Sequence, residues 1–125
     1  MTSNKKIVQN DPPQEKIKFI LELFNSNKLI NAKKEIDKEL IVYPKSPVLF
    51  NILGAVFAGQ NELQKALTSY KKSISISPHY TQAYNNLGAC MYKLGKITEA
   101  IQSYQKAIEI QPDHIKAYNN LGVIF

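Results

Sequence analysis

Residues 83–112 read AYNNLGACMYKLGKITEAIQSYQKAIEIQP, and the first six of these letters return at residues 117–122. The two copies of AYNNLG lie 34 residues apart, and the same interval separates Pro44, Pro78 and Pro112. Self-similarity at a fixed period of about 20 to 50 residues is the signature of stacked structural repeats. The chain is therefore predicted to consist of 34-residue units.

Small residues recur in the same register. They are Ala32, Ala66 and Ala100, and then Gly54, Gly88 and Gly122, where the first unit has Ile20. Small side chains let two helices approach closely, and large ones fill the wider gaps between helices. The large residues expected to fill these gaps are Phe50, Tyr84, Tyr118, Tyr70 and Tyr104.

Each unit is predicted to contain two helices joined by a tight turn. The turn position holds Asn27, Asn61 and Gly95, the residue types that best tolerate the left-handed conformation that ends a helix. The expected helices cover about residues 13–26, 29–43, 47–60, 63–77, 81–94, 97–111 and 115 onward. Ser46, followed by Pro47, is placed to cap one helix, and Asp113 to cap the helix that begins near Ile115.

Composition favours one soluble domain. The chain has 125 residues, 44% of them hydrophobic, and its longest apolar runs fall far short of the roughly 20 residues of a membrane helix. Its start does not resemble a signal peptide. The single cysteine, Cys90, excludes an internal disulfide and a zinc framework and fits a reducing compartment. We therefore expect a cytoplasmic protein without membrane association.

The net charge of +6 comes from lysines, and the chain has no arginine. Specific readout of nucleic acid usually relies on the arginine fork, so a specific nucleic-acid partner is not expected. His79 and His114 fall between repeats without an acid, serine or cysteine at motif spacing, and Cys90 is expected to be a small packed residue. No catalytic residue, cofactor site or metal site is predicted, and the chain is not expected to be an enzyme.

The order of aromatic, Leu-Gly, Gly, Glu-Ala, Tyr, Ala and Pro in residues 83–112 resembles the tetratricopeptide repeat (TPR). The matching positions are Tyr84, Leu87, Gly88, Ala100, Tyr104, Ala107 and Pro112, with Met91 where the family has an aromatic residue. The resemblance implies an all-α, right-handed solenoid of stacked antiparallel helix pairs. It would comprise three repeats and the first helix of a fourth.

The resemblance divides the chain as follows: a flexible tail at 1–12, a degenerate repeat or cap at 13–46, repeats at 47–80 and 81–114, and a truncated repeat at 115–125. The first repeat departs from the family at Lys16, Ile20 and Glu39, and the second has Ser73 for an alanine. A last helix ending in Val123, Ile124 and Phe125 would leave apolar surface exposed. We expect the chain to be the N-terminal piece of a longer protein; the alternative is that a partner or a second copy covers this helix.

In the TPR family the first helix of each pair lines a concave groove. The resemblance places a set of polar residues on this surface, namely Asn51, Gln82, Asn85, Asn86, Lys93, Lys116, Asn119 and Asn120. Asparagine donates and accepts at once, which suits the backbone of an extended peptide. A similar asparagine ladder occurs in O-linked N-acetylglucosamine transferases, at the positions matching Asn86 and Asn120. The alternative is that one asparagine of each pair bonds a neighbouring repeat or faces solvent.

Some TPR proteins hold a C-terminal carboxylate with a clamp of lysines, asparagines and an arginine. Asn86 and Lys116 match two clamp positions, but Asn51, Ala55 and Asn120 replace the Lys, Asn and Arg of the others. The sequence therefore favours a module that binds an extended protein segment, and not a chaperone tail. The alternatives are a substrate-recruiting domain of a larger glycosyltransferase or sulfotransferase whose catalytic part lies beyond residue 125, and a scaffold that self-associates through its last helix.

Overall fold

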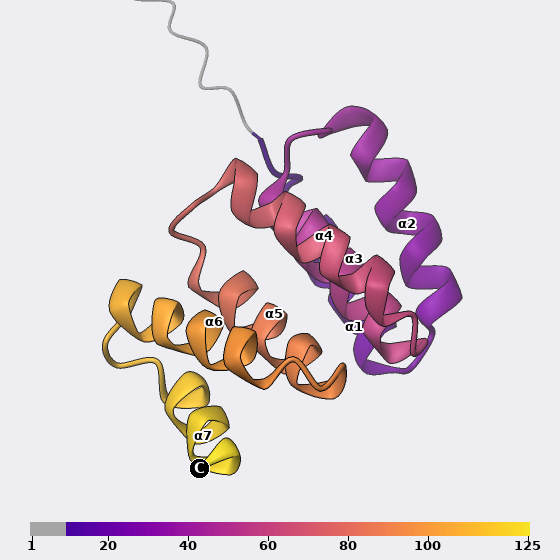
Figure 1. Cartoon of the computed structure of the whole chain (residues 1–125). Coiled ribbons are helices and arrows are strands. Elements are labelled where there is room, and N and C mark those ends of the chain that lie inside the picture. Colours follow the sequence, from indigo (N-terminus) through magenta and orange to yellow (C-terminus); the bar gives the residue numbers. More distant parts are fainter. Residues whose placement is uncertain (1–9) are drawn as a thin grey trace, which may run out of the picture.

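The computed structural model describes residues 10–125, which form seven α-helices (Figure 1). These are α1 (Gln14–Asn25), α2 (Leu29–Val42), α3 (Pro47–Gly59), α4 (Leu63–Ile76), α5 (Thr81–Lys93), α6 (Ile97–Ile110) and α7 (Ile115–Ile124). Every predicted helix is present, and each predicted boundary is confirmed to within one residue.

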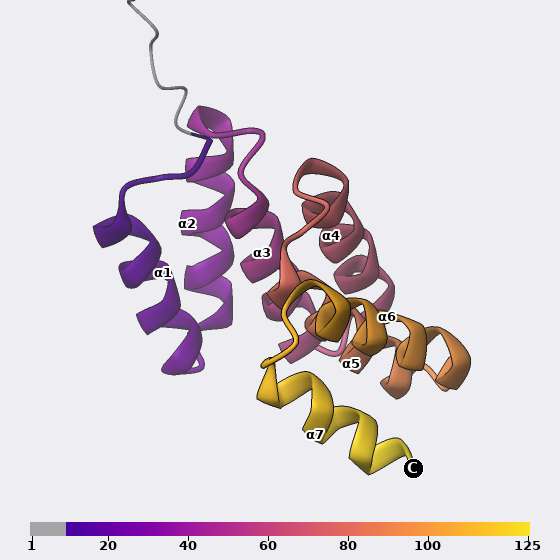
Figure 2. The ribbon, with the colours of Figure 1, turned by 90° about the vertical axis from the view of Figure 1, so that its left-hand side faces the viewer.

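The helices stack as antiparallel pairs in a right-handed solenoid, α1 with α2, α3 with α4 and α5 with α6, followed by α7 (Figures 1 and 2). Successive first helices contact one another, α1 with α3, α3 with α5 and α5 with α7. Within residues 10–125, no two of the second helices α2, α4 and α6 are in contact. The array is therefore more closely spaced on the side of the first helices, which places α3 and α5 on its inner, concave side.

The turns inside the repeats adopt the predicted left-handed conformation. The φ angles are 59° at Asn27, 60° at Asn61 and 77° at Gly95. Asparagine and glycine tolerate this region better than other residues. Each first helix therefore ends just before this residue, and the chain turns back there into the second helix of the pair. The same residue column thus sets the hairpin shape of all three pairs.

Helix starts differ between repeats. Ser46 is the N-cap of α3, and its Oγ accepts a hydrogen bond of 3.1 Å from the Leu49 amide, as predicted. The prediction that Asp113 caps α7 is wrong, because the N-cap is His114 and no side chain bonds the free amides there. Helix α7 begins one residue too late for the Asp113 carboxylate to occupy the cap position.

The predicted flexible tail falls partly outside the described residues, which begin at residue 10. Its last residues pack on the solenoid. Pro12 is buried, and the Asp11 carboxylate accepts a hydrogen bond from Ser46 Oγ. The cap residue of α3 therefore also holds the segment that precedes α1.

Two apolar clusters form the core, one around Ile20, Ile36 and Leu49 and the other around Tyr70, Leu87 and Tyr104. Gly54 and Gly88 lie against the rings of Tyr70 and Tyr104, which confirms the predicted pairing of small and large residues. Tyr118 does not fill a gap as expected, since half of it is exposed.

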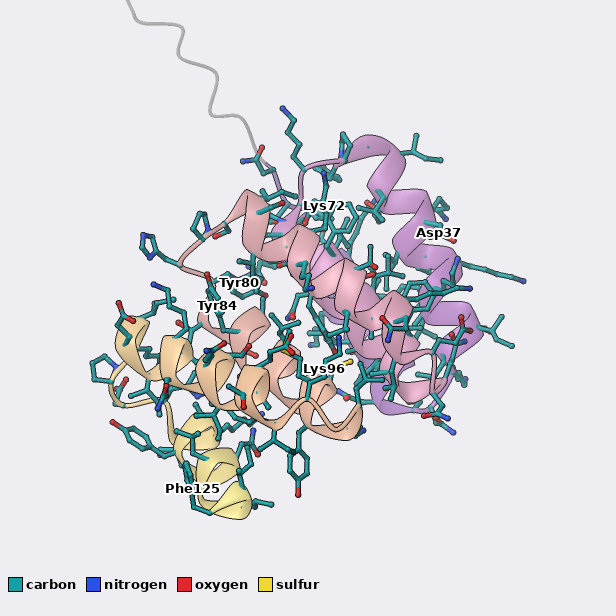
Figure 3. The ribbon with its side chains drawn as sticks, viewed as in Figure 1. Asp37, Lys72, Tyr80, Tyr84, Lys96 and Phe125 are labelled. Atoms are coloured by element: carbon teal, nitrogen blue, oxygen red, sulfur yellow. The ribbon has the colours of Figure 1, made fainter. Side chains whose placement is uncertain are left out.

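The last helix exposes the predicted apolar surface. Val123 is 70% and Phe125 is 85% exposed, and Phe125 lies at the far end of α7 (Figure 3).

Candidate functional site

The two copies of AYNNLG are joined by a hydrogen bond. Asn120 Nδ2 donates to Asn85 Oδ1 over 3.0 Å, and Asn86 Nδ2 donates to Asn51 Oδ1 over 2.9 Å. Each bond links positions 35 residues apart, one more than the repeat length, because the second asparagine of one helix reaches the first asparagine of the preceding repeat. We call this series of inter-repeat bonds the asparagine ladder. To continue it, a helix needs two adjacent asparagines, one that donates to the preceding repeat and one that accepts from the following repeat.

The acceptor asparagines are removed from the surface. Asn51 is 7% and Asn85 is 8% exposed, and Asn51 Nδ2 also lies 3.5 Å from the hydroxyl of Tyr80 at the start of α5 (Figure 3). In α5 both asparagines of the pair bond a neighbouring repeat, Asn85 as an acceptor and Asn86 as a donor. A direct contact of Asn51 or Asn85 with a ligand is therefore not favoured.

The donor asparagines keep one side of their amides free. Asn86 and Asn120 are half-buried, and the bonds to Asn51 and Asn85 fix which way each amide points. Among the residues that the structure describes, none donates a hydrogen bond to Oδ1 of Asn86 or Asn120. Both amides thus present an oriented acceptor and one spare N–H.

A hollow of about 280 Å³ adjoins Asn86. Its walls come from α1, α3, α4 and α5, and they are Phe24, Ala55, Ala58, Gly59, Tyr70, Asn86, Ala89, Cys90 and Lys93. Four of these residues are alanine or glycine, so small side chains on α3 and α5 create the space. The hollow has an apolar wall with an amide and an ammonium group at its edge, a combination typical of ligand sites.

Charge around the hollow is positive. Helices α3, α5 and α7 contain no aspartate or glutamate, and their charged residues are Lys93 and Lys116. Burial raises the pKa of the Cys90 thiol, while nearby Lys93 acts against this rise. Burial, and secondarily Cys90, also raises the pKa of Tyr70. Both groups therefore stay neutral near pH 7, and Cys90 is packed, with its Sγ 3.4 Å from the Leu63 carbonyl oxygen.

The structure brings only some of the predicted residues together. Asn86 and Lys93 share the hollow, whereas Gln82, Lys116 and Asn119 are exposed on α5 and α7 and do not line it. Phe24, which reaches the hollow from α1, was not among the predicted residues. The run of small residues at Ala55, Ala58 and Gly59 was the available signal, because it predicts missing volume on one helix face.

Other kinds of site find no support in the described residues. Between residues 10 and 125, no group of three or more His, Cys, Asp or Glu side chains is placed to hold a metal ion. No helix of this part of the chain is both long and apolar enough to cross a membrane.

Several solved structures share this fold. The first TPR of Spaghetti (RPAP3), bound to an HSP90 peptide, is 23% identical with a TM-score of 0.80, over 90% of this chain and 92% of that one. MamA is 26% identical with a TM-score of 0.78, over 87% of this chain and 64% of MamA. An O-GlcNAc transferase from Thermobaculum terrenum is 21% identical with a TM-score of 0.81, over 91% of this chain and 23% of the transferase.

None of the curated proteins compared with this chain by sequence matches it. The family model of the TPR repeat matches residues 54–95 and 91–125, which together make up more than half of the chain. With the helix pairs, the 34-residue register and these structural likenesses, the match shows that the chain belongs to the TPR family.

Proposed function

We propose that this chain is a protein-interaction module that binds an extended peptide segment along α3, α5 and α7. The observation that carries the proposal is the orientation of Asn86 and Asn120 by the asparagines of the preceding repeats. An amide held in one orientation loses little freedom when it binds, so it grips a peptide backbone more tightly than a mobile one. A backbone N–H of the peptide meets Oδ1, and a carbonyl oxygen meets the spare N–H.

The hollow beside Asn86 would receive a side chain of the bound segment. Its wall of alanine, glycine and Phe24 favours an apolar side chain, and Lys93 at its edge favours an acidic neighbour. The absence of acidic residues from α3, α5 and α7 disfavours basic segments. We therefore expect a neutral or acidic segment with one apolar anchor.

The structural neighbours support a peptide as the class of ligand. The first and second TPR domains of RPAP3 are bound to the peptides SRMEEVD and SGPTIEEVD, both of which carry acidic residues. At 23% and 17% identity these likenesses concern the fold, and the clamp positions of this chain differ at Asn51, Ala55 and Asn120. The proposal is therefore a segment held mainly by its backbone, without a requirement for a C-terminal carboxylate.

A display library of random linear peptides, selected on the immobilised chain, tests this proposal. The double variant Asn86→Ala, Asn120→Ala of the chain is expected to bind the selected peptides with an affinity lower by about tenfold or more. The reason is that two hydrogen bonds of about 1 kcal/mol each are lost. Exposed Gln105 on α6 offers a matched amide control, and Gln105→Ala is expected to bind like the wild type. Unchanged binding by the double variant would exclude the asparagine contact.

A second control separates contact from support. Asn51→Ala removes the same inter-repeat bond as Asn86→Ala but leaves the Asn86 amide in the groove. It is expected to weaken binding less than Asn86→Ala does. Equal losses would mean that Asn86 acts through the bond to Asn51 and not through the ligand.

A second candidate function is the recruitment of substrates to a glycosyltransferase or sulfotransferase whose catalysis takes place outside this chain. The likeness in fold to a transferase, of which the match spans 23%, favours it. Both candidates use the same groove and differ in the partner. Proteins captured by the wild-type chain but not by the double variant distinguish them, because a recruiting domain enriches segments that carry glycosyl or sulfate groups.

A further inference from the structure

A second hollow lies away from the asparagine groove, between α1 and α2. Its volume is about 210 Å³, and its walls are Glu15, Lys16, Phe19, Ile20, Glu35, Lys38 and Glu39. In Figure 2, the two helices come together at the loop that joins them and diverge toward their other ends. Lys16 and Glu39 belong to these diverging ends, near the start of α1 and the end of α2.

Glu39 is the unusual residue of this hollow. It is 4% exposed, and its Oε2 lies 3.2 Å from Lys16 Nζ. Its Oε1 is buried and has no hydrogen-bond partner among residues 10–125. A buried carboxylate oxygen without a partner is costly, and each such group calls for an explanation such as a functional role or a bound species. The corresponding residues in the next repeats are Ser73, whose Oγ donates to the Pro47 carbonyl oxygen over 2.7 Å, and Ala107. The carboxylate is thus specific to the first repeat.

We infer that this hollow binds the guanidinium group of an arginine side chain supplied by a partner protein. Lys16 satisfies one carboxylate oxygen, whereas a planar guanidinium donates two parallel hydrogen bonds and would satisfy both. The chain has no arginine, so the group must come from another molecule. The Lys16 side chain is 54% exposed and can move into solvent when the guanidinium enters.

The remaining walls suit an arginine side chain. Phe19 is 48% exposed, and its ring offers a face for the guanidinium plane or its aliphatic stem. Three glutamates and two lysines line the hollow, which makes it negative in a chain of net charge +6. Lys38 is held 3.6 Å from Glu35, so its charge is partly offset.

An adjoining hollow explains why the arginine is expected within a protein segment. It measures about 150 Å³, shares Phe19 and Glu35 with the first, and continues along Leu23, Asn31 and Lys34. A free amino acid would leave this space empty, whereas a residue next to the arginine in a peptide would place an apolar side chain against Leu23.

The test is a titration of the full chain, followed by NMR, with acetyl-arginine-N-methylamide and with acetyl-lysine-N-methylamide. The arginine probe is expected to shift the signals of Glu39, Phe19 and Ile20 and to bind at least about tenfold more tightly than the lysine probe. The signals of Asn86 and Asn120 should not move, which keeps this site distinct from the groove. Equal affinities for the two probes, or shifts elsewhere, would overturn the inference.

Three variants sharpen the test. Glu39→Gln is expected to lower the affinity for the arginine probe by about tenfold, while Glu109→Gln, at an exposed pair with Lys106, leaves it unchanged. Lys16→Met removes the competing ammonium and is expected to raise the affinity. If Lys16→Met lowers it instead, the two residues form a structural pair and not a ligand site.

The peptide acetyl-Leu-Arg-Leu-amide distinguishes the sources of the guanidinium. It is expected to bind more tightly than the single blocked arginine because it also fills the adjoining hollow. Equal binding would point to a small guanidinium compound and overturn the assignment to a protein partner.

Discussion

The first helix pair and the two that follow use the same register to make different contacts. In the pair α3–α4, Gly54 lies against Tyr70, and in the pair α5–α6, Gly88 lies against Tyr104. The pair α1–α2 has Ile20 and Ile36 at the same register positions. Both solutions bury their residues, since Ile20 is 1%, Tyr70 is 3% and Ile36 is 0% exposed. A glycine with a tyrosine brings two backbones close together, whereas two isoleucines hold them apart. The spacing of a repeat therefore depends on the pair of residues, and a match at one column alone does not fix it.

The largest effect is expected from exchanging one contact type for the other. Ile20→Gly should lower the free energy of unfolding by about 4 kcal/mol, because it leaves a cavity and places glycine inside a helix. Adding Ile36→Tyr should restore about 1 to 2 kcal/mol, since the pair then matches Gly54 and Tyr70. Denaturant unfolding of the two single variants and the double variant measures this coupling. If Ile36→Tyr further destabilises Ile20→Gly, the two crossings differ in more than these residues.

A smaller effect is expected at the glycine crossings themselves. An added Cβ at Gly88 would lie 2.7 Å from the Tyr104 ring, so Gly88→Ala should cost about 2 kcal/mol of stability through overpacking. Gly122, in the same column on α7, has no atom within 4 Å of an added Cβ. Gly122→Ala should therefore stabilise by about 0.5 to 1 kcal/mol. Thermal unfolding compares the two, and similar shifts of Tm would refute the close approach at Gly88.

The last expected effect is absent near neutral pH and develops only in alkaline solution. Burial raises the pKa of Tyr70 and Tyr104 above the ordinary value of 10.0, whereas the first pair has Ile36 at this position. Above about pH 10 the unfolded chain loses these protons before the folded chain does, so stability falls by up to about 1.4 kcal/mol per pH unit for each tyrosine. Tyr70→Phe should reduce this slope. Unfolding curves at about pH 8 and about pH 11 measure it, and an unchanged slope would assign the loss to other groups.

Sequence reasoning located the helices well because each boundary carries a local signal. Asn27, Asn61 and Gly95 mark turns by their own conformational preference, and Ser46 marks a helix start by its own hydrogen bond. Asp113 was placed wrongly because a shift of one residue in a loop is enough to remove a cap.

The site was harder to predict because it depends on how repeats are placed against each other. The 34-residue register does not reveal that Asn86 reaches Asn51, since that contact spans 35 residues and depends on the offset between neighbouring helices. Which asparagine of each pair would be buried therefore stayed open. Phe24 was missed for a similar reason, because it lies on α1 and joins a hollow whose other walls belong to later repeats.

The asparagine ladder has a direction, and this makes the repeat a unit that can be copied. It begins at Asn51, because the corresponding residue of the first repeat is Ile17. Each later helix gives one hydrogen bond back and offers one forward. A duplication of residues 81–114 would extend the ladder in phase, whereas an insertion of a single residue between Asn85 and Asn120 would put every later rung out of phase. Such a chain can lengthen its ladder by gene duplication alone, one whole repeat at a time.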